Sequence, residues 1–340
     1  MGSVFQRFWN ALWNSQPSGA TASIPGLPQA GEASAQPERL GYPPSFPALP
    51  ADERVERSQL FDPALQKYSR GFRLGEPTFL DPEIGHRWFA ARRRVMDHLV
   101  QVIGESDWKN SLVLRGSYLL KHWLGDVARE PKDLDWVIRP VQPSWLSLSD
   151  WGVFKGLTAL ILQRRQLPGS EIRIESIVND EIWAYDRVPG RRMVLTWQAE
   201  DLPLGTSQMD FSLNDQMWHA PVETTLTLPE GRSTTVWIAS PELSLAWKLL
   251  WLGTDTYPQG KDLYDATLLA EHYKLPSDLV LLTMKAVIDG NGRWEFTEEH
   301  LDDWFFQWED FKKDYPGIQG TEEEWLKRLL VAIKPAFVAL

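Results

Sequence analysis

The chain has 340 residues, of which 43% are hydrophobic and 24% are charged, and its formal net charge is −11. This composition is typical of a globular protein with a sizeable core, and it excludes a chain that is disordered throughout. The sequence has no cysteine, which excludes disulfides, cysteine-ligated zinc, iron–sulfur clusters and thiol catalysis. No run of about 18 apolar residues occurs, so we expect no membrane span and a cytoplasmic location.

Acidic residues are concentrated in the C-terminal part of the chain. Between Glu295 and Glu324 the sequence holds eleven acidic residues and two lysines, so this stretch carries a local charge of −9. Such a stretch argues against a general nucleic-acid coat, although it leaves the charge of an individual cleft open.

The N-terminal part of the chain differs in composition from the rest. Residues 1–60 are rich in proline and alanine, which predicts a flexible tail. Within this tail, residues 4–13 repeat apolar side chains every three to four positions, which favours a short helix with an aromatic face. Such a helix docks into a groove on a partner or on its own domain; the alternative is a disordered terminus. The apolar residues are Val4, Phe5, Phe8, Trp9, Leu12 and Trp13.

The region after the tail mixes helical and strand patterns. A helix is predicted over residues 83–103, and its arginines face either solvent or a phosphate backbone. Strands are predicted over 111–115 and 133–138, separated by a Gly116-Ser117 turn and a helix over 118–124. A helix at 151–166 follows, and then strands at 171–178, 181–187, 192–197, 207–213, 224–228 and 234–238.

After Pro241 the hydrophobic pattern keeps a helical period. We therefore predict an α+β fold, with a mixed domain over residues 76–240 and a helical domain over residues 241–340. The helices expected in the second domain are 241–252, 261–273, 278–288, 298–313 and 322–340.

Two aspartates alternate with apolar residues in the segment DLDWVI. Asp133 and Asp135 are two positions apart, so a strand places both carboxylates on one face, about 7 Å apart at their Cα atoms. A shared divalent cation relieves the repulsion between them, and hard oxygen ligands suit Mg²⁺. The alternative is two solvent-facing acids on an edge strand.

Two neighbouring features strengthen the metal hypothesis. The Gly116-Ser117 turn between a strand and a helix offers backbone N–H groups and a hydroxyl, which suit a phosphate. Asp210 in SQMDFSL points away from its apolar neighbours and is the best candidate for a third carboxylate, with Glu175 as a weaker one. Phosphate donors beside paired carboxylates are typical of metal-assisted nucleotidyl transfer.

Four segments in order resemble the motifs of the AbiEii/AbiGii toxin nucleotidyltransferases, which belong to the DNA polymerase β-type nucleotidyltransferase superfamily. These segments are LRGSYLL, AREPKDLDWVI, LAWKLLWL and GKDLYDATLLAEHY, and the resemblance covers roughly residues 88–273. It implies a nucleotidyltransferase-fold mixed sheet with flanking helices, followed by a C-terminal helical domain. It also implies metal binding by Asp133 and Asp135, catalysis by these two and Asp210, and nucleotide binding by Gly116, Ser117, Arg129, Lys248, Lys261, Asp262 and Asp265.

The activity that the resemblance implies is Mg²⁺-dependent transfer of NMP from an NTP to an acceptor hydroxyl. The expected acceptor is a tRNA 3′ end, in a toxin–antitoxin or phage-defence setting with a cognate antitoxin or another protein partner. Two alternatives stay open. The acidic character favours transfer to a protein hydroxyl, and the aromatic N-terminal segment suggests a non-catalytic partner-binding subunit of a defence complex.

Overall fold

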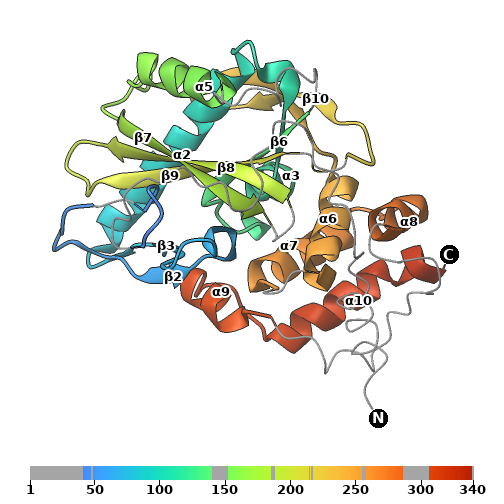
Figure 1. Ribbon diagram of the computed structural model, residues 1–340. Coiled ribbons are helices and arrows are strands. Elements are labelled where there is room, and N and C mark those ends of the chain that lie inside the picture. The colour runs from blue at the N-terminus through green and yellow to red at the C-terminus, as the bar shows by residue number, and fades with distance from the viewer. Residues whose placement is uncertain are drawn as a thin grey trace.

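The computed structural model describes residues 41–46, 49–139, 152–184, 188–213, 215, 217–254, 258–285 and 306–338. The aromatic segment predicted at residues 4–13 lies outside these ranges, as does the first half of the helix predicted at 298–313. A seven-stranded sheet is flanked by helices, and the C-terminal helices gather at one side of it (Figure 1). The predicted α+β class is therefore confirmed.

The sheet has the strand order β10-β11-β5-β6-β9-β8-β7. The pairs β11–β5 and β6–β9 are parallel and the other pairs are antiparallel, so the sheet is mixed as expected. The strands are β5 (Leu112–Arg115), β6 (Asp133–Ile138), β7 (Arg173–Ala184), β8 (Val188–Gln198), β9 (Gly205–Leu213), β10 (Val222–Thr227) and β11 (Ser233–Ile238).

One long strand replaces two predicted ones. The sequence predicted separate strands at 171–178 and 181–187, but β7 continues through the polar residues between them because its pairing with β8 continues there. Asp180 pairs with Arg192 across the two strands, and its carboxylate accepts hydrogen bonds from Ser45 N and the Tyr68 hydroxyl. The local sequence around Asp180 favours the end of a strand, but these hydrogen bonds to Ser45 and Tyr68 allow Asp180 to lie within β7.

The two faces of the sheet bury different helices. Leu134 and Trp136 of β6 pack in a core that includes Leu99 of α2 (Pro82–Gly104) and Leu157 of α5 (Gly152–Gln163). Val137, on the opposite face, packs in a second core with the C-terminal helices. Because alternate residues of a strand share a face, the two aspartates of β6 point toward the side of the C-terminal helices.

The helix that opens the mixed region begins with two local signals. The Asp81 side chain accepts a hydrogen bond from Glu83 N, and Pro82 occupies the first helical position. Within the described residues, no helix combines the length and the apolar composition needed to cross a membrane.

The helices that follow β11 in the sequence pack together in the second core. The remaining helices are α3 (Ser117–Leu124), α6 (Pro241–Thr254), α7 (Gly260–His272), α8 (Ser277–Lys285), α9 (Trp308–Asp314) and α10 (Glu322–Val338), with short 3₁₀ turns η1 (Pro63–Leu65), η2 (Lys109–Ser111), η3 (Gly125–Val127) and η4 (Pro229–Gly231).

Short strands lie partly inside the range predicted as a tail. β1 (Val55–Glu56) pairs with β4 (Thr78–Phe79), and β2 (Gln59–Phe61) pairs with β3 (Phe72–Leu74). Strands of two or three residues are too short to produce a readable alternation. Figure 1 shows β2 and β3 beside α9, so an early segment of the described chain lies next to one of the C-terminal helices.

A buried histidine of α2 makes the stability of this fold sensitive to acid. His98 Nε2 lies 2.8 Å from the Arg164 carbonyl oxygen, and burial lowers the pKa of the imidazole. The unfolded chain, with a His pKa of about 6.5, then binds more protons than the folded one, so the free energy of unfolding falls as the pH drops below about 6.5. We expect His98→Gln to weaken this pH dependence.

The comparison is urea unfolding at pH 7.5 and at pH 5.5. His86→Gln is the control, because His86 is exposed on the same helix. An unchanged pH dependence in His98→Gln would contradict the prediction.

Candidate active site

Three predicted carboxylates come together on neighbouring strands. Asp133 and Asp135 lie on β6, and Asp210 lies on the parallel strand β9 directly opposite Asp135. The alternating residues Leu134 and Met209 are fully buried in the core on the other face. All three carboxylates line one cavity of about 240 Å³ between the sheet and the C-terminal helices. The weaker candidate Glu175 lies on the edge strand β7, where it pairs with Arg173.

The two aspartates of β6 differ in their tendency to ionise. Burial, together with the charge of Asp133, raises the pKa of Asp135 to about 7. Burial also opposes ionisation of Asp133, but the positive charges of Lys261 and Arg129 hold its pKa below the usual range. The pair is thus short of positive charge, and a divalent cation with a preference for oxygen ligands fits it. Among the described residues, no group of three or more His, Cys, Asp or Glu is arranged as a metal site.

The turn between β5 and α3 lies directly against this pair. Gly116 has φ +82°, and a Cβ at this position would lie 2.2 Å from Asp135 Oδ2. Ser117 follows at the start of α3; its Oγ is buried and has no hydrogen-bond partner in the described part of the chain. A buried hydroxyl without a partner and the free N–H groups of a helix start together suit a phosphate oxygen.

A single arginine holds the third carboxylate. Arg192 of β8 donates from Nε and Nη2 to the two oxygens of Asp210, at 2.9 and 2.8 Å, and Gln208 also donates to Oδ2. Its remaining nitrogen, Nη1, donates to Asp62 Oδ2 at 2.7 Å. Burial raises the pKa of Asp210, and Arg192 opposes that shift.

Sequence reasoning missed both Arg192 and Asp62 as site residues. Arg192 is directly opposite Asp210 in the antiparallel pairing of β8 with β9, so the register of these strands was the signal needed. Asp62 carried no signal, because it lies between the predicted tail and the predicted mixed domain.

Four of the predicted nucleotide-binding residues contact one another in a buried network. Lys248 of α6 donates to Asp262 and Asp265 of α7, at 2.6 and 2.9 Å. Arg129, before β6, donates through two nitrogens to Asp265 at 2.9 and 2.8 Å. Burial opposes the charge on Asp265, but Arg129 and Lys248 hold its pKa below the usual range. Charges in this network neutralise one another and join the helices to the start of β6.

Lys261 differs from these neighbours. It lies on the first turn of α7 and lines the cavity, and it forms no ion pair with any residue that the structure describes. Its charge lowers the pKa of Asp133, so it faces the carboxylates. Lys261 is therefore the lining cation that is available to a phosphate.

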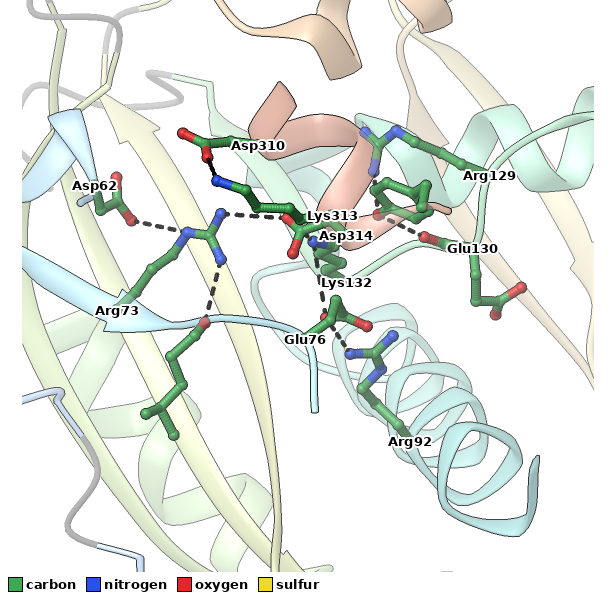
Figure 2. A network of polar contacts seen from close by, with 12 residues as sticks. Asp62, Arg73, Glu76, Arg92, Arg129, Glu130, Lys132, Asp310, Lys313 and Asp314 are labelled. Carbon is green, nitrogen blue, oxygen red and sulfur yellow. Dashed lines mark hydrogen bonds and ion pairs between the residues drawn. The ribbon is translucent and has the colours of Figure 1, made fainter. Parts of the chain in front are cut away.

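One wall of the cavity is held together by a second polar network (Figure 2). Arg73 of β3 lies 3.8 Å from Asp62 and 3.9 Å from Asp314 of α9. Lys132, before β6, contacts Asp314 and lies 4.0 Å from Glu76. This network therefore connects the N-terminal strands, the strand that carries the aspartates, and α9.

Three of the four arginines of α2 are paired with acids, and the fourth, Arg87, is exposed. Arg92 contacts Glu76 at 2.8 Å and is buried. The other described pairs are Arg93 with Asp97 and Glu130, and Arg94 with Glu230.

Removal of one carboxylate from the buried network should destabilise the protein strongly. Asp265→Asn removes a carboxylate that compensates the buried charges of Arg129 and Lys248. We therefore expect a loss of about 3–5 kcal/mol in the free energy of unfolding. Urea unfolding of the full chain measures it. Glu271→Gln is the matched control, because Glu271 pairs with Arg328 on the exposed side of the same helix, where such pairs contribute about 0–1 kcal/mol. Equal losses in both variants would disprove the assignment.

The candidate site lies within a match to a known protein family. The family model described as "Nucleotidyl transferase AbiEii toxin, Type IV TA system" matches residues 97–329, which is more than half of the chain. The match includes the three carboxylates, the Gly116-Ser117 turn and the buried network, and it leaves Asp62 outside. A search of the curated proteins finds no match. The chain belongs to the AbiEii family of nucleotidyl transferase toxins.

Proposed function

We propose that the protein is a Mg²⁺-dependent enzyme that transfers NMP from an NTP to the 3′-terminal hydroxyl of a tRNA. The observation that carries this proposal is the meeting of three carboxylates on β6 and β9 with a glycine–serine turn whose buried hydroxyl lacks a partner. The family supplies the coarser statement, a nucleotidyl transferase toxin of a type IV toxin–antitoxin system, which implies an antitoxin counterpart. A role in phage defence is part of the proposal.

The reaction requires one bond to form and one to break. The acceptor hydroxyl oxygen attacks the α-phosphorus, and the bond from this phosphorus to the oxygen that bridges to the β-phosphate breaks. Pyrophosphate leaves with that electron pair. The hydroxyl proton passes to a carboxylate, and we assign this role to Asp210, which Arg192 holds in a fixed orientation.

The donor nucleotide is held by groups that the described structure leaves available. Ser117 Oγ donates to a terminal phosphate oxygen, the first N–H groups of α3 face the same phosphate, and Lys261 adds a positive charge. Asp133 and Asp135 hold Mg²⁺, which when bound supplies charge that neutralises the triphosphate. Arg129, Lys248, Asp262 and Asp265 position the nucleotide by keeping α7, and with it Lys261, in place.

Labelled transfer tests the proposal directly. Purified protein is incubated with Mg²⁺ and each α-³²P-labelled NTP in turn, with total tRNA or a lysate protein fraction as the acceptor. We expect label on tRNA, and Asp133→Asn and Asp135→Asn should reduce the rate by at least about 10²–10³-fold, because each removes a proposed metal ligand.

The identity of the labelled acceptor distinguishes transfer to tRNA from transfer to a protein. Label on protein instead of tRNA would overturn the tRNA proposal and favour transfer to a protein hydroxyl. No transfer to either acceptor, together with no Mg²⁺-dependent NTP binding, would overturn the proposed activity.

Gly116→Ala tests whether the turn must lie close to Asp135. The new methyl group would collide with the Asp135 carboxylate, so we expect transfer to fall by at least about tenfold through misplacement of a catalytic group. Gly125→Ala is the matched control at the other end of α3: its φ is also positive, at +62°, but a Cβ there meets nothing within 4 Å. Backbone strain alone would affect both variants alike, and that result would contradict the prediction.

A further inference from the structure

A carboxylate from outside the matched family domain reaches the candidate site. Asp62 lies in the segment between β2 and β3, and it is 7% exposed. One oxygen accepts from Ala64 N at 3.0 Å, and the other accepts from Arg192 Nη1 at 2.7 Å. Burial opposes its ionisation, but Arg192 and Arg73 lower the pKa of Asp62 to about 2, so it carries a full negative charge at neutral pH.

Arg192 is thereby shared between two carboxylates. Two of its nitrogens bind Asp210 and the third binds Asp62, so the plane of the guanidinium is fixed from both sides. The side chain is 4% exposed, which leaves it no alternative solvation by bulk water. The orientation of the Asp210 carboxylate therefore depends on a contact that Asp62 completes.

The sharing also sets the charge of the site. Asp62, Arg192 and Asp210 together carry one net negative charge, whereas Arg192 and Asp210 alone carry none. The negative charge of Asp62 acts on Asp210, where it adds to the rise in the pKa of that carboxylate, and in a cavity of low effective dielectric such a charge favours binding of a cation beside Asp210. Arg73 also lies 3.8 Å from Asp62, but it is shared with Asp314, so Asp62 still offsets the positive charge that Arg192 brings beside Asp210.

The segment that carries Asp62 is anchored on its other side. Arg73 of β3 lies between Asp62 and Asp314 of α9, and Lys132 contacts the same Asp314 (Figure 2). Asp62 therefore meets Arg192 from a segment fixed to both the strand of the aspartates and the C-terminal helices.

We infer that Asp62 is a positioning residue, which acts through Arg192 to orient the carboxylate of Asp210 and to preserve negative charge beside it. The N-terminal segment with β2 and β3 is then part of the active centre, although it lies outside the family domain. The inference rests on the proposed function for the reaction that Asp210 serves.

The test compares Asp62→Asn with wild type by two readouts. The first is the affinity of the purified full chain for Mn²⁺, measured by electron paramagnetic resonance without nucleotide. We expect the Kd to rise about tenfold, because one negative charge is lost near the carboxylates. The second is transfer kinetics: kcat should fall at least about tenfold with the KM for NTP within about twofold, because the donor phosphates contact other residues.

Two further variants serve as controls. Asp52→Asn makes the same chemical change just before β1, at a partly exposed residue that is paired with Arg54 and does not line the cavity, and it should match wild type in both readouts. Asp62→Glu keeps the charge and should recover the Mn²⁺ affinity to within about threefold of wild type. It also keeps the inference testable if the asparagine variant fails to fold.

The outcomes separate this inference from the proposed function. If Asp62→Asn equals Asp52→Asn in Mn²⁺ affinity and in kcat, or if Asp62→Glu is as weak a Mn²⁺ binder as a folded Asp62→Asn, the inference is overturned. If wild type transfers no nucleotide but Asp62→Asn still weakens Mn²⁺ binding, the proposed function fails while the charge-setting role of Asp62 is supported.

Discussion

Mutual repulsion among three carboxylates on adjacent strands is the constraint on which the rest of the structure depends. Asp133, Asp135 and Asp210 share one face of β6 and β9 in a cavity where water screens them poorly. Separate parts of the chain supply the compensating charge: Arg192 comes from β8 and Lys261 from α7. Asp135 receives the least compensation, and its raised pKa marks the place where a cation is wanted.

The C-terminal helices contribute to the site mainly by holding it in position. Lys248 and Arg129 both donate hydrogen bonds to Asp265, and burial makes each member of the set depend on the others. Replacing such a set with apolar residues is often neutral, whereas removing one member is costly. The set therefore fixes the relation of α7 to β6, and with it the distance from Lys261 to the paired aspartates.

Local patterns predicted most elements, and pairing between distant segments accounts for what they missed. The alternation in DLDWVI, the Gly116-Ser117 turn and the third carboxylate at Asp210 follow from period and spacing, and the structure brings them together. Arg192 became visible only through the register of β8 with β9. Asp62 lies between two three-residue strands, and its ion pair is with Arg192, 130 positions further along the chain. Neither a periodicity nor a composition encodes such contacts.

The balance of charge in the cavity bears on how a nucleotide enters it. Eight cationic and eight acidic side chains line the cavity, so the lining has no surplus of positive charge for a triphosphate. Seven of these cations already form ion pairs with carboxylates. Among the described residues that line the cavity, Lys261 is the cation without an ion pair. A nucleotide that arrives with its own divalent cation meets this cavity without a large penalty, whereas a bare triphosphate does not. The proposed Mg²⁺ thus serves entry of the donor as well as reaction, and Asp62 favours the metal-bound nucleotide over the free one by adding negative charge.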